Sequence, residues 1–73
     1  MTIVYTNPNC VACDQTKRWL DKNNLDYDVV DLSKDSEALA MVQDLGFKAA
    51  PVVITDADKW AGFRLDKLQA LAA

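Results

Sequence analysis

The sequence predicts an α/β fold, a mixed four-stranded sheet flanked by three helices, in the order β-α-β-α-β-β-α. Three observations lead to this prediction. A β-branched strand opens the chain, stretches of helical periodicity then alternate with strand-like segments, and two short strands directly precede the last helix. At 73 residues, the chain 1–73 is expected to form one domain.

The first strand is predicted over Thr2–Tyr5, because TIVY is apolar throughout, as expected for a central strand. The turn-forming residues TNPN end it. Val11–Asn23 then has helical periodicity, with Cys13 and Leu20 on the apolar face. Asparagine tolerates the left-handed conformation, so Asn23 or Asn24 is expected to end this helix.

A second, more exposed strand is predicted over Leu25–Leu32, where apolar residues alternate with aspartates. Ser33 and Asp35 are both candidate N-caps for a helix over Ser36–Leu45, which Gly46 should end. The apolar residues expected to face the core from this helix are Ala38 or Leu39, Val42 and Leu45.

Two short strands, Val52–Thr55 and Lys59–Ala61, are separated by a tight turn of three residues and should form a hairpin. Gly62 turns the chain into a last helix over Arg64–Ala73. Its inward-facing residues are expected to be Leu65, Leu68 and either Leu71 or Ala72.

The first two strands are joined through a helix, so they should lie parallel through a right-handed crossover. In sheets of this kind, ligand chemistry gathers at the carboxyl ends of the strands. Cys10 lies just beyond one of these ends, which favours a functional role.

The charge pattern excludes some partners. A formal net charge of −3, a sequence pI near 4.5 and dispersed basic residues argue against nucleic acid or an anionic membrane. The amino end lacks a signal peptide, and no apolar run approaches the ~20 residues of a membrane span. We therefore expect a cytoplasmic monomer, in a compartment where paired cysteines are more often catalytic or metal-binding than structural.

Both cysteines of the chain lie in NPNCVACD, and there is no histidine. A Cys10–Cys13 bridge closes too short a loop to restrain the unfolded chain much. If Cys10 caps the first helix, residues three apart hold their Cα atoms roughly 5–6 Å apart, within the range of a disulfide. A C-x-x-C pair between a strand and a helix in a βαβ context points to a thioredoxin-like redox site.

The two sulfurs should differ in reactivity. Cys10 faces the free amides and the positive end of the helix dipole, which stabilise a thiolate, whereas Cys13 should be buried and keep its proton. Cys10 is therefore expected to attack a target disulfide and Cys13 to resolve the mixed disulfide. Pro8 fixes the backbone just before the nucleophile. The sequence names no proton acceptor for Cys13.

On these residues the chain resembles the glutaredoxin branch of the thioredoxin superfamily, and within it the NrdH-redoxins. The resemblance covers essentially the whole chain. It depends on VYTNPNCVACDQTKRWLD, YDVVDLSKDSEA, LGFKAAPVV and WAGFRLDKL. The last block discriminates best, because ordinary glutaredoxins have a Gly-Gly and acidic segment there that helps to hold glutathione.

The resemblance implies a thioredoxin/glutaredoxin-like fold and a dithiol–disulfide oxidoreductase that carries electrons through a redox-active Cys10–Cys13 disulfide, with no bound cofactor or metal. It implies reduction by thioredoxin reductase at the expense of NADPH and electron transfer to the large subunit of class Ib ribonucleotide reductase. It also implies a cis-proline at Pro51, beside which an extended target peptide pairs. The expected partner-binding residues are Pro8, Val11, Ala12, Ala50 and Pro51, and the expected supporting motif is Trp60, Ala61, Gly62, Phe63 and Arg64.

The sequence departs from the family pattern at four positions. The family usually has lysine, glutamine, serine and proline where this chain has Asn7, Ala12, Ala61 and Leu65. Losing a cation at Asn7 removes one thiolate stabiliser, and Ala61 cannot donate the hydrogen bond that serine would.

Three other function classes remain open. A glutathione-dependent glutaredoxin is the nearest. A Cu(I) chaperone would also use C-x-x-C thiolates, but its fold places two strands between the helices. A closed zinc or iron–sulfur site needs four ligands, of which one chain offers two.

Two aromatic residues and one cation have alternative roles. Trp19 is predicted to pack in the core, whereas Trp60 is as consistent with packing as with a partner surface. Arg64 is expected either to pair with an acid near the hairpin or to satisfy the start of the last helix. Met41 and Phe47 are predicted core residues.

Overall fold

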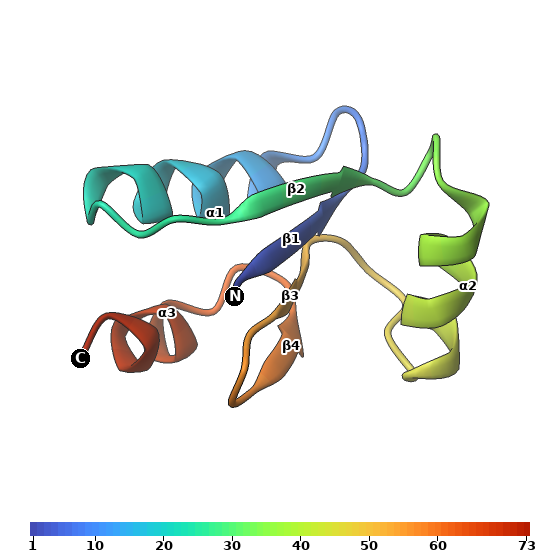
Figure 1. The fold of residues 1–73 in the computed structure, drawn as a ribbon. Helices are drawn as coiled ribbons and strands as arrows, with labels where there is room; N and C mark the ends of the chain where they lie inside the picture. The colour runs from blue at the N-terminus through green and yellow to red at the C-terminus, as the bar shows by residue number, and fades with distance from the viewer.

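The computed structural model describes residues 1–73 and has the predicted order of elements (Figure 1). The strands are β1 (Ile3–Thr6), β2 (Asp28–Asp31), β3 (Val52–Ile54) and β4 (Lys59–Ala61), and the helices are α1 (Val11–Lys22), α2 (Ser36–Asp44) and α3 (Leu65–Ala72). No helix is long and apolar enough to cross a membrane.

The four strands form one mixed sheet in the order β2-β1-β3-β4. β1 pairs in parallel with β2 and antiparallel with β3, and β3 and β4 form the predicted antiparallel hairpin. β1 is thus an interior strand, as its apolar sequence predicted, and its carboxyl end leads directly into the segment that carries both cysteines.

Each face of the sheet has its own hydrophobic cluster. Leu20 of α1 and Leu68 of α3 pack on one face together with Trp60, whereas Val42 of α2 packs with Tyr5 on the other. In Figure 1, α1 and α3 accordingly lie on one side of the molecule and α2 on the opposite side. The fold is therefore a three-layer α/β arrangement around a small sheet.

Local side chains and backbone conformations set the helix ends. Of the two predicted N-caps, Asp35 is the one used, because its carboxylate accepts a hydrogen bond from the Ala38 amide at 3.0 Å. Ser33 instead donates its hydroxyl hydrogen to Asp31. Asn24 (φ 56°) follows α1 in the left-handed conformation, and Gly46 (φ 92°) follows α2.

The second strand is shorter than predicted, because Leu25–Tyr27 does not join the sheet. Leu25 and Tyr27 pack against the hydrophobic cluster that contains Leu20 of α1. The Tyr27 hydroxyl also donates a hydrogen bond to the Asp21 carboxylate at 2.8 Å. Pairing begins at Asp28, opposite Ile3, because the parallel partner β1 itself has only four residues.

The prediction of inward-facing residues was wrong at two leucines, Leu45 on α2 and Leu65 on α3, which are 39% and 44% exposed. Of the two alternatives on α2, Ala38 packs against the core and Leu39 is exposed. These helices span only nine and eight residues, and each has one fully buried residue, Val42 or Leu68. Partly buried neighbours pack against the same clusters, namely Ala38, Met41 and Leu71.

Candidate active site

Cys10 is the N-cap of α1. Its backbone is extended, and its sulfur accepts a hydrogen bond from the Cys13 amide at 3.1 Å. Asn9, in the left-handed conformation (φ 58°), turns the chain into this position. The first-turn amides of a helix have no intrahelical acceptors and carry the positive end of the dipole. Cys10 thus caps the helix as predicted, and amides in this position favour a thiolate on its sulfur in the reduced state.

The two cysteines are joined in a disulfide with their Cα atoms 5.2 Å apart, within the separation predicted from helical spacing. Cys13 is buried, with 1% of its surface exposed, whereas Cys10 is half-buried. An approaching disulfide therefore reaches the Cys10 sulfur first, and Cys13 lies one helical turn away on the core side.

The loop before β3 lies against the Cys10 sulfur. The Ala50 carbonyl oxygen is 3.7 Å from Cys10 Sγ, and the Ala50–Pro51 peptide bond is cis, as predicted. In the reduced state the Cys10 thiol can donate its proton to this carbonyl, whereas the oxidised sulfur has none to donate. The chain thus brings together two segments that lie 40 positions apart in the sequence.

The expected supporting motif, Trp60–Arg64, which we call the tail motif, contacts this loop through its backbone. The Gly62 amide donates to the Pro51 carbonyl at 2.7 Å, and Ala61 lies opposite Val52 in the hairpin ladder. Gly62 has a φ of 86°, which favours glycine at this turn. The motif is therefore tied to the cis-proline segment by main-chain hydrogen bonds that need no serine at Ala61.

The side chains of the motif have different surroundings. Trp60 is 4% exposed and belongs to the core, which decides between the two predicted roles, and its indole nitrogen has no hydrogen-bond partner. Phe63 is 37% exposed. Arg64 donates two hydrogen bonds to the Asp66 carboxylate, at 3.0 and 2.8 Å, so it pairs at the start of α3 and not with the hairpin.

The charges around the hairpin pair locally. Lys67 on α3 donates to Asp58 of the β3–β4 turn at 2.9 Å, and this hydrogen bond lowers the pKa of Asp58. The Arg64 guanidinium likewise lowers the pKa of Asp66. Both pairs are exposed to solvent and so contribute little to stability individually. The Lys67–Asp58 pair joins α3 to the hairpin turn, and neither pair involves the cysteines.

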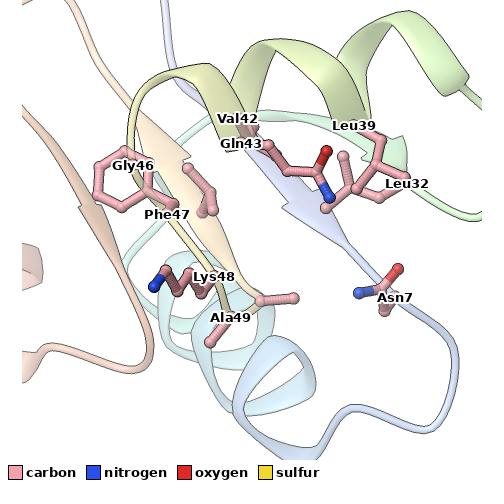
Figure 2. A pocket seen from close by; sticks show the side chains of 11 residues that line it. Asn7, Leu32, Leu39, Val42, Gln43, Gly46, Phe47, Lys48 and Ala49 are labelled. Atoms are coloured by element: carbon pink, nitrogen blue, oxygen red, sulfur yellow. The ribbon is translucent and has the colours of Figure 1, made fainter.

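A pocket of about 370 Å³ lies beside the Cys10 loop, between α2, the loop before β3 and the end of β1 (Figure 2). Asn7 and Ala50 line the side nearest the disulfide, and Leu39, Gln43 and Lys48 line the remainder. Sequence reasoning missed the residues of α2 and Lys48 because their role depends on how α2 crosses the sheet. No signal in the sequence marked them, because the pattern placed Leu39 among the candidates for the core and its exposure is seen only in the structure.

Trp19, Met41 and Phe47 occupy the places predicted for them. All three are partly buried and pack against the two clusters of the core, Trp19 on the α1 side and the other two on the α2 side. No group of three or more histidine, cysteine or carboxylate side chains lies close enough together to hold a metal ion.

The family profile named Glutaredoxin matches residues 2–60. The chain belongs to the glutaredoxin family. Within that family, its relatives are of the NrdH type. The glutaredoxin-like protein NrdH of Lactococcus lactis is 35% identical over 72 residues, covering 99% of this chain and all of that protein. The NrdH of Escherichia coli is 34% identical, over 93% of this chain and 84% of the relative.

Solved structures show the same relationship. The NrdH-redoxin of Escherichia coli, described as having a thioredoxin-like activity profile, superposes with a TM-score of 0.94 at 33% identity, over 96% of this chain and 92% of its own. The thioredoxin-like protein BC3987 superposes with a TM-score of 0.87 at 36% identity, over 97% and 99%. The protein is therefore an NrdH-like, glutaredoxin-like redox protein of thioredoxin fold.

Proposed function

We propose that this protein is a dithiol electron carrier that thioredoxin reductase reduces with NADPH and that in turn reduces a disulfide of class Ib ribonucleotide reductase. The observation that carries the proposal is the unequal cysteine pair. The half-buried Cys10 sulfur caps a helix and accepts the Cys13 amide at 3.1 Å, while Cys13 is 1% exposed. The Cys10–Cys13 pair carries the two electrons as a dithiol and gives them up on closing the disulfide, so the cycle requires no bound cofactor.

The reduced protein acts in two exchange steps. The Cys10 thiolate attacks one sulfur of the target disulfide, forming a mixed disulfide and releasing the other target sulfur as a thiolate. Cys13 then loses its proton and attacks the Cys10 sulfur, which releases the second target thiolate and closes the Cys10–Cys13 bond. The target takes up two electrons and two protons. The reductase restores the two electrons and one proton to the carrier from the hydride of NADPH, and the second proton comes from solvent.

Two features support this choice of partners. The first is the likeness to NrdH proteins over nearly the whole chain. The second is the tail, where Trp60–Arg64 stands in place of the Gly-Gly and acidic segment that helps glutaredoxins to hold glutathione. This cycle belongs in the cytoplasm, where protein dithiols are kept reduced.

A glutathione-dependent activity is the second candidate. The pocket beside Ala50, with the Lys48 cation on its wall, offers room for a small thiol next to the Cys10 sulfur.

The deciding experiment follows NADPH oxidation with a protein disulfide as electron acceptor. One mixture contains thioredoxin reductase, and the other contains glutathione with glutathione reductase. We expect turnover in the first mixture only. A Cys10→Ser variant should lose all turnover, because the attacking sulfur is gone. A Cys13→Ser variant should stop after the first exchange step, with the target held on Cys10 as a mixed disulfide. Turnover in the glutathione mixture alone would assign the protein to the second candidate.

A further inference from the structure

The outer face of α1 carries an aromatic and cationic groove that the exchange reaction itself does not use. The groove lies between α1 and the β4–α3 connection. It is lined by Gln15, Arg18, Trp19, Lys22 and Phe63. Trp19 and Phe63 form its apolar surface, and the two cations border it.

The two cations that border the groove form no ion pair within the molecule. Arg18 and Lys22 are exposed and take part in none of the ion pairs of the molecule, whereas Lys17, on another side of the same helix, pairs with Asp14 at 3.7 Å. The chain as a whole carries a net charge of −3. A local pair of free cations on an acidic protein attracts an acidic partner segment.

The groove is continuous with the reactive end of the helix. Val11, Gln15, Arg18 and Lys22 follow one another at helical spacing along a single face, so this face runs from between the two cysteines to the last turn of α1. Val11 lies between the two cysteines in the sequence and is 73% exposed, so it is open to a partner at the Cys10 sulfur. A protein that brings its disulfide to Cys10 therefore lies across Val11 and can extend along the groove.

We propose that this groove docks an acidic segment of the protein that exchanges disulfides with Cys10, with an aromatic or aliphatic side chain of that segment inserted between Trp19 and Phe63. The partner's acids pair with Arg18 and Lys22 at the border. The inference rests on the proposed function and deepens it, because it assigns the recognition of the protein partner to α1. This helix lies on the opposite side of the molecule from α2.

The kinetic test uses reduction of the protein by thioredoxin reductase and NADPH. The double variant Arg18→Glu with Lys22→Glu should raise KM about tenfold at low salt, with the effect on KM exceeding that on kcat and shrinking as salt screens the charges. The matched control is Lys34→Glu with Lys59→Glu, which reverses two exposed, unpaired cations outside the groove and should leave KM within about twofold. Equal KM values for the two double variants would overturn the proposal.

A second measurement does not depend on the identity of the reductase. An acidic peptide with a central phenylalanine among glutamates and aspartates is titrated into the ¹⁵N-labelled protein and followed by NMR. We expect amide shifts confined to the outer face of α1 and Phe63, abolished in the Arg18→Glu/Lys22→Glu variant and absent with the glutamine and asparagine analogue of the peptide. If thioredoxin reductase fails to reduce the wild-type protein, the proposed function fails. The titration still tests whether the groove binds an acidic segment. Amide shifts on another surface, or no amide shifts, would overturn the proposed docking groove.

Discussion

At the scale of single residues, the reactivity of the site depends on where two sulfurs lie relative to one helix start. Cys10 caps α1 outside the first turn, and Cys13 lies within that turn on the buried side. The N-terminal amides and the dipole favour a thiolate on the outer sulfur, and Asn7, where the resemblance to NrdH-redoxins implies a lysine, adds no charge. We therefore expect the Cys10 thiol to have a lower pKa than the Cys13 thiol. The difference between the two pKa values should be smaller than in relatives with a lysine at position 7.

Restoring the cation tests this account. Asn7 and Ala50 line the same pocket, and the Ala50 carbonyl lies 3.7 Å from Cys10 Sγ. An Asn7→Lys variant should lower the pKa of Cys10 and raise its alkylation rate at neutral pH about twofold, because a nearby positive charge favours the thiolate. The pH dependence of iodoacetamide alkylation of the reduced protein measures this. An Asn7→Gln variant is the uncharged control. An unchanged alkylation profile in the lysine variant would show that position 7 does not act on the thiol.

At the scale of elements, the short helices depend on few contacts. α3 spans eight residues, and Leu68 is its one fully buried side chain, while Leu65 is 44% exposed. The amphipathic pattern alone made these two leucines equivalent. The hairpin and the Gly62 turn decide which of them reaches the sheet, because they fix the angle at which the helix begins.

The two leucines give a matched pair of variants. Leu68→Ala should lower the free energy of unfolding by about 3 kcal/mol, through lost burial and the cavity left in the cluster with Leu20 and Trp60. Leu65→Ala should lower it by less than about 1 kcal/mol, because its side chain already contacts water. Urea denaturation followed by circular dichroism compares them. Equal losses in the two variants would show that the described packing of α3 is wrong.

At the scale of the whole molecule, exposed aspartates couple stability to pH. Hydrogen bonds from Ser33, Lys67 and Arg64 hold the pKa values of Asp31, Asp58 and Asp66, respectively, below the ordinary 3.8. A carboxylate with a depressed pKa in the folded state stabilises that state above its unfolded pKa. This contribution is lost as the pH falls through the folded pKa.

The folded protein should therefore lose stability between about pH 5 and about pH 2, mostly below the ordinary aspartate value. A variant in which asparagine replaces Asp31, Asp58 and Asp66 should show a flatter dependence over this range. Urea midpoints measured at several pH values give both curves. A triple variant with the same slope as the wild type would mean that other carboxylates cause the acid sensitivity.

Much of this architecture could be predicted from the chain because it follows from local chemistry. The periodicity and turn residues placed every helix and strand, and the Lys59–Ala61 strand was predicted residue for residue. The position of Cys10 at a helix start followed from the strand and turn before it. What could not be predicted were the shortened second strand and the exposed leucines, because both depend on the length of a neighbouring element and not on their own sequence.

The sequence by itself thus determined the order of elements, the position of Cys10 at a helix start and the spacing of the cysteine pair, since helix capping and spacing act within a few residues. Only the tertiary structure decided which distant groups meet. It brought the Ala50 carbonyl to the Cys10 sulfur, tied Gly62 to Pro51, buried Trp60 and placed Phe63 beside Trp19. The physical reason is that these contacts join segments far apart in the chain. The local pattern leaves many such pairings equally possible, and the packing of the helices on the sheet selects among them.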